Sequence, residues 1–218
     1  MVDARVGDSR PHSHLAHQAC LAVESEVEIV GDSSLLVPRN HAALIPAGVV
    51  HRLGPAGAQT RSFFIDAALS GPKRDWRTLS LLLPVASARA LGAIADFEAA
   101  NEFASKMAGR ALSPSIDARI AKALLLATPG SSATELARRA GISPSRLREI
   151  AIRDYGVPPS KLLQWRQLMH AVAAVGEGCG LADAAAAGGF ADQSHFTRRC
   201  VQWLGVTPRS GLGSLFVG

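Results

Sequence analysis

The chain has 218 residues, which is enough for one large domain or two small ones, each with its own hydrophobic core. Its 48% hydrophobic and 19% charged residues are typical of a globular protein, and no apolar run approaches the roughly 18 residues of a membrane span. The N-terminus lacks the apolar segment of a secretory signal, and the three cysteines are far apart in the chain. These features predict a cytoplasmic protein with no membrane partner.

The net charge of +5 comes entirely from the second half of the chain. Residues 1–111 contain 11 basic and 11 acidic side chains, whereas residues 112–218 contain 12 basic and 7 acidic ones. An excess of positive charge in one half indicates a polyanionic partner for that half, with nucleic acid as the leading candidate. The alternative at this point is a basic surface without a partner.

Short β segments are predicted in the first part of the chain. Residues 21–30, 34–38, 42–46 and 61–69 are rich in apolar and β-branched side chains, and glycine and proline separate them. Several short strands with closely spaced turn signals are typical of an antiparallel sandwich or barrel.

The pattern becomes helical from Pro84 onward. A second helix is predicted after Ser113, which is a candidate N-cap followed by Pro114, with a helical stripe that includes Ile120 and Leu124. The predicted organisation is a β-rich domain over residues 1–83, a helical linker region over 84–112, and an all-α domain over 113–218.

The all-α domain contains an internal repeat with a spacing of 49 residues. The paired positions are Leu147 with Phe196, Ala151 with Cys200, Gly156 with Gly205, Val157 with Val206, and Pro159 with Pro208. Two copies are too few for a solenoid, so the repeat indicates a duplicated supersecondary unit.

Each copy is predicted to fold as helix, tight turn, helix. In the first copy, Ser132 and Ser143 are candidate N-caps, and Gly141 ends the first helix. In the second copy, Gly189 ends the first helix and Asp192 caps the next one. Between the copies, residues 158–175 place apolar side chains every three or four positions, which predicts a long helix that connects the two units.

The outward faces of the two second helices are polar and cationic. An α-helix fits the major groove of DNA, where Arg, Gln and Ser hydrogen-bond base edges and phosphates. A helical hairpin with an ordinary solvated face is the alternative for either copy alone, and the duplication within a basic half argues against it.

Residues 113–213 resemble the double helix-turn-helix DNA-binding domain of AraC/XylS-family transcription regulators. The resemblance rests on "ATELARRAGISPSRL", "YGVPPSKLLQWRQLMHA" and "GGFADQSHFTRRCVQWLGVTP". It implies binding to a double-stranded DNA operator, contact with RNA polymerase if the protein is an activator, and a candidate homodimer. The DNA-binding residues that follow from it are Ser145, Arg146, Arg148, Glu149, Arg153, Gln193, Ser194, Thr197, Arg198 and Arg199. The chain departs from the family pattern at Glu149, where an Arg is common, and at Gly180, where a hydroxyl cap is usual.

The N-terminal part contains a histidine cluster in "RPHSHLAHQ". His12 and His14 are expected on one face of a strand, and "IPAGVVH" supplies His51 from a second strand. This arrangement resembles the metal-binding pattern of the cupin barrel, except that Gln18 stands where those proteins usually have Glu. The resemblance implies an effector site at these four residues, or a divalent metal site for Zn, Ni or Fe.

The sequence therefore predicts a two-domain α+β protein, with a cupin-like β-barrel or sandwich followed by the two helix-turn-helix units. We expect a transcription regulator, not an enzyme, whose N-terminal domain senses a small molecule or a metal. A cupin metalloenzyme with a helical appendage is the alternative from another class. A regulator whose barrel serves only for dimerisation is the third hypothesis.

Overall fold

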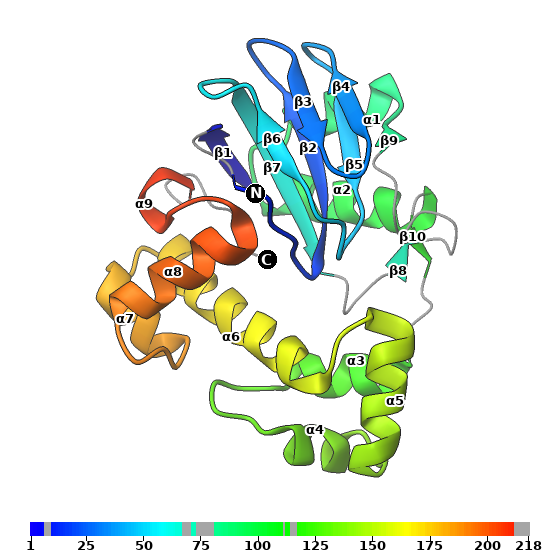
Figure 1. Ribbon diagram of the computed structural model, residues 1–218, viewed down its shortest axis with the longest axis vertical. Coiled ribbons are helices and arrows are strands. Elements are labelled where there is room, and N and C mark those ends of the chain that lie inside the picture. The colour runs from blue at the N-terminus through cyan, green and yellow to red at the C-terminus, as the bar shows by residue number, and fades with distance from the viewer. Residues whose placement is uncertain (7–9, 67–70, 73–80, 111, 114–116, 212–218) are drawn as a thin grey trace.

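The computed structural model describes the whole chain except residues 7–9, 67–70, 73–80, 111, 114–116 and 212–218. Figure 1 shows a β-rich N-terminal part above a set of C-terminal helices. This arrangement confirms the predicted fold class of antiparallel sheets followed by an all-α region. None of the described helices combines the length and the apolarity that a bilayer-spanning helix needs.

The N-terminal part is built from antiparallel sheets. The strands are β1 (Val2–Arg5), β2 (Ala16–Ala22), β3 (Val27–Val30), β4 (Ser34–Val37), β5 (Ala42–Ile45), β6 (Arg52–Gly54), β7 (Gln59–Asp66), β8 (Gly71–Pro72), β9 (Leu81–Leu82) and β10 (Leu112–Ser113). Five of them form one sheet in the order β1-β7-β2-β5-β9, and three form a second sheet in the order β4-β3-β6. The short strands β8 and β10 pair with each other.

The central strand β2 shows how the pleat divides the core. Successive side chains of a strand point to opposite faces of the sheet. Cys20 and Ala22 on one face pack with Val27 and Ile29 of the three-stranded sheet, so the two sheets form a sandwich. Leu21 on the other face packs with the helices that follow β9.

Two helices cover that other face of the larger sheet. They are α1 (Val85–Gly92) and α2 (Phe97–Arg110), and Leu91 and Phe103 share a hydrophobic cluster with Leu44 and Phe63 of the strands. The region expected as a helical linker thus contributes side chains to the core of the N-terminal part.

Two local expectations for the N-terminal half were wrong, and one strand was not predicted. The segment 21–30 is not one strand, because residues 23–26 form a turn between β2 and β3. His12 and His14 precede β2 instead of lying on a regular strand, and His12 forms a single bridge with His51. Strand β1 had no clear sequence signal, since its stability comes from pairing with β7.

The C-terminal part contains helices of the predicted kind. They are α3 (Ala118–Leu125), α4 (Ala133–Arg139), α5 (Pro144–Tyr155), α6 (Pro159–Gly176), α7 (Leu181–Ala187), α8 (Gln193–Leu204) and α9 (Pro208–Gly211). The long connecting helix is confirmed as α6, with α5 and α8 at its opposite ends (Figure 1).

The predicted start of the first C-terminal helix was wrong. Ser113 pairs with Gly71 in a short ladder, and Pro114 lies outside the described residues. The N-cap is Asp117, whose carboxylate accepts a hydrogen bond from the backbone N–H of Arg119. A carboxylate satisfies the unpaired N–H groups of a first turn and interacts favourably with the helix dipole.

The two parts of the molecule share a hydrophobic core. Ala16 of β2 is fully buried in one cluster with Trp165 and Leu168 of α6. An ion pair between Arg166 and Asp66 also joins α6 to the end of β7, with 3.3 Å between Nη1 and Oδ2. The five-stranded sheet and the second helical unit are therefore packed directly against each other.

Candidate nucleic-acid interface and histidine cluster

The first helical unit, α4 and α5, has the local structure that its sequence predicts. The side chain of Ser132 accepts a hydrogen bond from the N–H of Glu135, and Ser143 does the same for Arg146. Gly141 between the helices has a φ of +67°, in the left-handed region that favours glycine. These caps fix where the candidate recognition helix α5 begins.

The second unit, α7 and α8, repeats this geometry. Asp192 caps α8 by accepting a hydrogen bond of 2.6 Å from the N–H of His195. Gly156 and Gly205, which are equivalent in the repeat, end α5 and α8 with φ values of 73° and 70°. Gly180 begins α7 without a capping side chain, as the sequence indicated.

The inner and outer faces of the recognition helices are divided as expected. Leu147 and Ala151 are buried in the first unit, and Phe196 and Cys200 are buried in the second. Of the predicted DNA-contacting residues, Thr197 and Arg199 are partly buried, and the exposed ones are Ser145, Arg146, Arg148, Glu149, Arg153, Gln193, Ser194 and Arg198.

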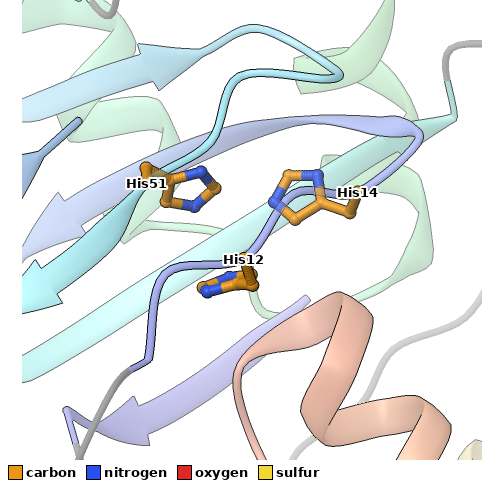
Figure 2. A group of neighbouring side chains, drawn as sticks. All are labelled: His12, His14 and His51. Carbon is orange, nitrogen blue, oxygen red and sulfur yellow. The ribbon is translucent and has the colours of Figure 1, made fainter. Parts of the chain in front are cut away.

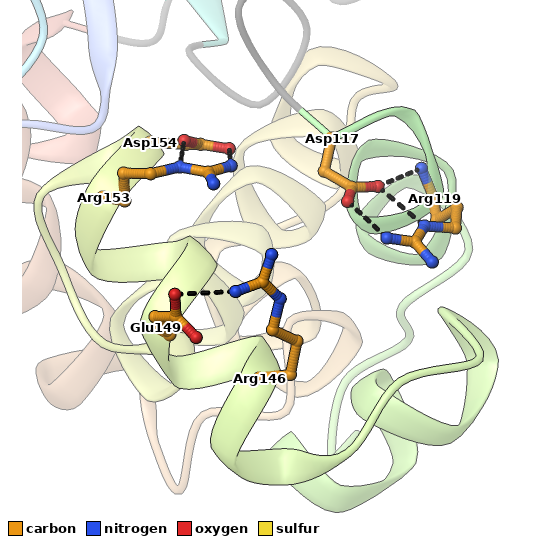
Figure 3. Close-up of polar contacts among 6 residues, drawn as sticks. All are labelled: Asp117, Arg119, Arg146, Glu149, Arg153 and Asp154. Carbon is orange, nitrogen blue, oxygen red and sulfur yellow. Dashed lines mark hydrogen bonds and ion pairs between the residues drawn. The ribbon is translucent and has the colours of Figure 1, made fainter.

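Two of the three arginines of α5 are paired within the helix. Arg146 donates to Glu149 at 2.6 Å, and Arg153 pairs with the adjacent Asp154, as Figure 3 shows. Two of its predicted phosphate anchors thus already contact carboxylates. Asp117 and Arg119 form a similar pair at the start of α3.

The second unit presents its positive charge differently. Arg199 donates to the amide oxygen of Gln202, and its guanidinium lies 5.7 Å from the centre of the Trp203 ring. Within the described residues Arg198 makes no ion pair, and its side chain is exposed. Arg198 of α8, like the exposed Arg148 of α5, is therefore available to a polyanion.

The histidine cluster is brought together as the sequence predicted. One ring nitrogen each of His12, His14 and His51 lies within 4.8 Å of the others, and Figure 2 shows the three side chains around a common space. Oε1 of Gln18 lies 3.0 Å from Nε2 of His14 and 3.2 Å from Nε2 of His51. Neighbouring His17 points to the other face of β2, where Nδ1 accepts from the N–H of Ala47.

Burial keeps the three rings neutral. It lowers the pKa of His14 to about 3, and the neighbouring His51 and His12 lower it further in the same direction. Burial, with a smaller contribution from His12, lowers the pKa of His51 to about 4. Burial also lowers the pKa of His12. Neutral imidazole is the form that binds metals.

A cavity of about 700 Å³ opens beside this cluster, between the two parts of the molecule. His12 and His14 line it from the N-terminal side, and Tyr155, Lys161 and Trp203 line it from the C-terminal side. The Tyr155 hydroxyl is buried without a hydrogen-bond partner in the described residues. Tyr155, Lys161 and Trp203 were not predicted as site residues. In the sequence each resembles an ordinary helix residue, and only the fold places it at the cavity.

Comparisons with known proteins agree with the helix-turn-helix units predicted from the repeat. A family model described as "Helix-turn-helix domain" matches residues 136–211. No curated protein matches the chain.

Solved structures of ToxT from Vibrio cholerae are similar over nearly the whole chain. One at 1.65 Å resolution has a TM-score of 0.63 and 12% sequence identity, and the match covers 94% of both chains. ToxT with a bound unsaturated fatty acid has a TM-score of 0.64 at 12% identity, with 95% of this chain and 91% of that chain covered. ToxT bound to (E)-4-(8-methylnaphthalen-1-yl)but-3-enoic acid has a TM-score of 0.61 at 12% identity, with 94% and 95% covered. At this identity the likeness establishes a shared two-part fold.

Proposed function

Because residues 136–211 form a helix-turn-helix domain of the AraC type, we propose that the protein is a sequence-specific transcription regulator. The observation that carries this proposal is the duplicated unit, with two capped recognition helices held at opposite ends of α6. A rigid connecting helix lets one chain read two successive major-groove segments. A protein that works on DNA would act in the cytoplasm of a bacterial cell.

The basic side chains of the two recognition helices would anchor to phosphates. Arg198 and Arg199 are free of carboxylates among the described residues, whereas Arg146 and Arg153 would exchange their present partners for phosphate. The candidate base readers are Ser145, Arg148, Glu149, Gln193, Ser194, Thr197 and Arg198. Glu149 can accept from the exocyclic amine of cytosine.

The N-terminal part would carry the sensor function, as a cupin-like sandwich. The cavity between the two parts is lined by the ring of Trp203 and by Lys161, whose ammonium nitrogen lies 5.9 Å from the centre of that ring. That lining suits an effector with an apolar body and an acidic group. Two of the similar ToxT structures contain carboxylic acids, which supports this effector class.

The competing hypotheses predict different behaviour. A regulator whose sandwich serves only for dimerisation would show no effector-dependent change in operator affinity. An activator would in addition contact RNA polymerase. A cupin metalloenzyme would turn over a substrate without DNA, and the helix-turn-helix match argues against it.

Selection from a random DNA pool at fixed salt tests the proposal. We expect enrichment of a site with two half-sites about one helical turn apart, and binding to it at least about 1000-fold tighter than to scrambled DNA. Salt is fixed because phosphate contacts make the affinity strongly salt-dependent. A pool that shows no enrichment after repeated rounds would contradict sequence-specific binding.

A further inference from the structure

The three clustered histidines are held in the same tautomer by the backbone. In each ring Nδ1 contacts a carbonyl oxygen two residues away. These contacts are His12 to Arg10 at 3.0 Å, His14 to Ala16 at 2.7 Å, and His51 to Val49 at 2.9 Å. A carbonyl can only accept, so each Nδ1 carries the hydrogen and each neutral ring keeps its lone pair on Nε2.

The Nε2 side of the cluster lacks hydrogens. Nε2 of His14 and Nε2 of His51 both face Oε1 of Gln18, at 3.0 and 3.2 Å. The Gln18 amide nitrogen points the other way and donates to Oγ of Ser62 at 2.8 Å. Three acceptor atoms facing one another repel, unless a cation lies between them or the Gln18 amide rotates by 180°.

The two Gln18 distances fit the edges of a tetrahedral site, whereas the histidine nitrogens lie within 4.8 Å of one another and would draw closer around an ion. Ligand atoms about 2.0–2.1 Å from a tetrahedral zinc ion lie about 3.3 Å apart. A hydrogen bond from the distal nitrogen to a backbone carbonyl is also the usual support for a metal-ligating histidine. The cluster thus has both the inner ligands and the outer hydrogen bonds of a metal site.

We propose that Nε2 of His12, His14 and His51, with Oε1 of Gln18, binds a divalent ion of the zinc class, and that His12 transmits its occupancy to the second helix-turn-helix unit. The regulatory half of this proposal rests on the proposed DNA-binding function. The metal-binding half does not depend on it.

The transmission runs through Gly205, which ends the recognition helix α8. A Cβ atom at Gly205 would lie 2.6 Å from Cε1 and 2.9 Å from Nε2 of His12, so the backbone of Gly205 lies directly against that ring. A second contact runs from His14 to Trp165, whose ring stacks on Trp203 of α8. His12 therefore contacts the end of α8 directly, and His14 reaches α8 through Trp165 of the connecting helix α6.

Metal binding would hold the His12 ring in one orientation. Because Gly205 packs against this ring, the C-terminal end of α8 would then be held in one position. Coupling between two sites is reciprocal, so the factor by which metal changes operator affinity must equal the factor by which DNA changes metal affinity. We expect this factor to lie in the range of about 5 to 150.

Gly205→Ala provides a test that does not alter a ligand. The full-length protein is titrated with Co²⁺, whose visible absorption reports tetrahedral nitrogen ligation, and Zn²⁺ affinity is then measured by competition. The added methyl group would displace His12, and we expect metal affinity to fall at least tenfold.

Gly156→Ala is the matched control. It introduces the same left-handed strain, since Gly156 has a φ of +73° and ends α5 at the equivalent repeat position. A Cβ there would meet nothing within 4 Å, so metal affinity should stay within twofold of the original protein. Gln18→Glu, which supplies an anionic ligand, should raise the affinity.

The outcomes separate the two proposals. A Co²⁺ titration without ligand-field bands, in a folded protein that binds its selected operator, would overturn the metal site and leave the regulator proposal standing. Equal losses in the Gly205 and Gly156 variants would overturn the contact through His12. Tight metal binding with unchanged operator affinity would overturn the coupling. A protein that binds metal but selects no DNA sequence would instead contradict the proposed function.

Discussion

At the scale of single residues, the two recognition helices differ in how much of their charge is available. The first helix contains the pair between Arg146 and Glu149, which must separate before either side chain contacts DNA. Exposed ion pairs of this kind contribute less than about 1 kcal/mol, so opening the pair costs little. Arg198 of the second helix and Arg148 of the first are exposed and make no ion pair among the described residues, so neither has a carboxylate to release before it contacts DNA.

Arg198→Ala should therefore weaken operator binding by about 1–3 kcal/mol, or roughly 5- to 150-fold, measured by fluorescence anisotropy at fixed salt. Arg39→Ala is the control, because Arg39 is exposed in the turn before β5 in the N-terminal part. Arg61 would be a poor control, since it is tied to Asp3 and to the carbonyl of Gly92. Unchanged affinity of the Arg198 variant would remove it from the interface.

At the scale of elements, capping side chains decide where the recognition helices begin. The N-cap residues Ser143 and Asp192 each accept a hydrogen bond from the N–H three residues later. A glycine in the left-handed region ends each helix. These local devices place both polar faces at equivalent positions in the two units.

Asp192→Ala should lower the free energy of unfolding by about 1 kcal/mol, because the first turn of α8 loses its side-chain acceptor. Denaturant titration followed by circular dichroism measures this change. The neighbouring exposed residue Gln193 gives the comparison, since Gln193→Ala removes no cap and should change stability by less than about 0.5 kcal/mol. Equal effects of the two substitutions would contradict the role of the cap.

At the scale of the whole molecule, the sheet and the second helical unit share one hydrophobic cluster. Ala16 of β2 lies in the same cluster as Trp165, Phe196 and Trp203. The ion pair between Arg166 and Asp66 is mostly buried, with 17% and 14% of the side chains exposed. A shared core of this kind predicts a single thermal transition for the described parts.

Asp66→Ala should lower stability by about 2 kcal/mol, because it leaves the mostly buried Arg166 guanidinium with less compensation. Differential scanning calorimetry should show a lower Tm and, if the two parts separate, a second transition. Lys106→Ala removes the exposed pair with Glu102 and should change stability by less than about 1 kcal/mol. A Tm for the Asp66 variant equal to that of the Lys106 variant would contradict the bridging role.

The local features of this protein follow from its sequence alone. The 49-residue repeat, the caps at Ser132, Ser143 and Asp192, and the buried face that includes Phe196 all follow from helical periodicity and from hydrogen bonds between near neighbours. The clustering of the three histidines was also predicted, from the family resemblance, although His12 and His14 do not lie on the regular strand that the prediction assumed. The start of the helix after Ser113 was not, because a strand pairing took that residue.

The contacts between these local units are visible only in the tertiary structure. The contact of His12 with Gly205 joins residues 193 positions apart, and the cavity adds Lys161 and Tyr155 to the histidine cluster. Such contacts depend on packing between distant segments and leave no periodic pattern in either segment. The physical link from the candidate sensor site to the DNA-reading helix therefore becomes visible only when the sheet and α8 are packed together.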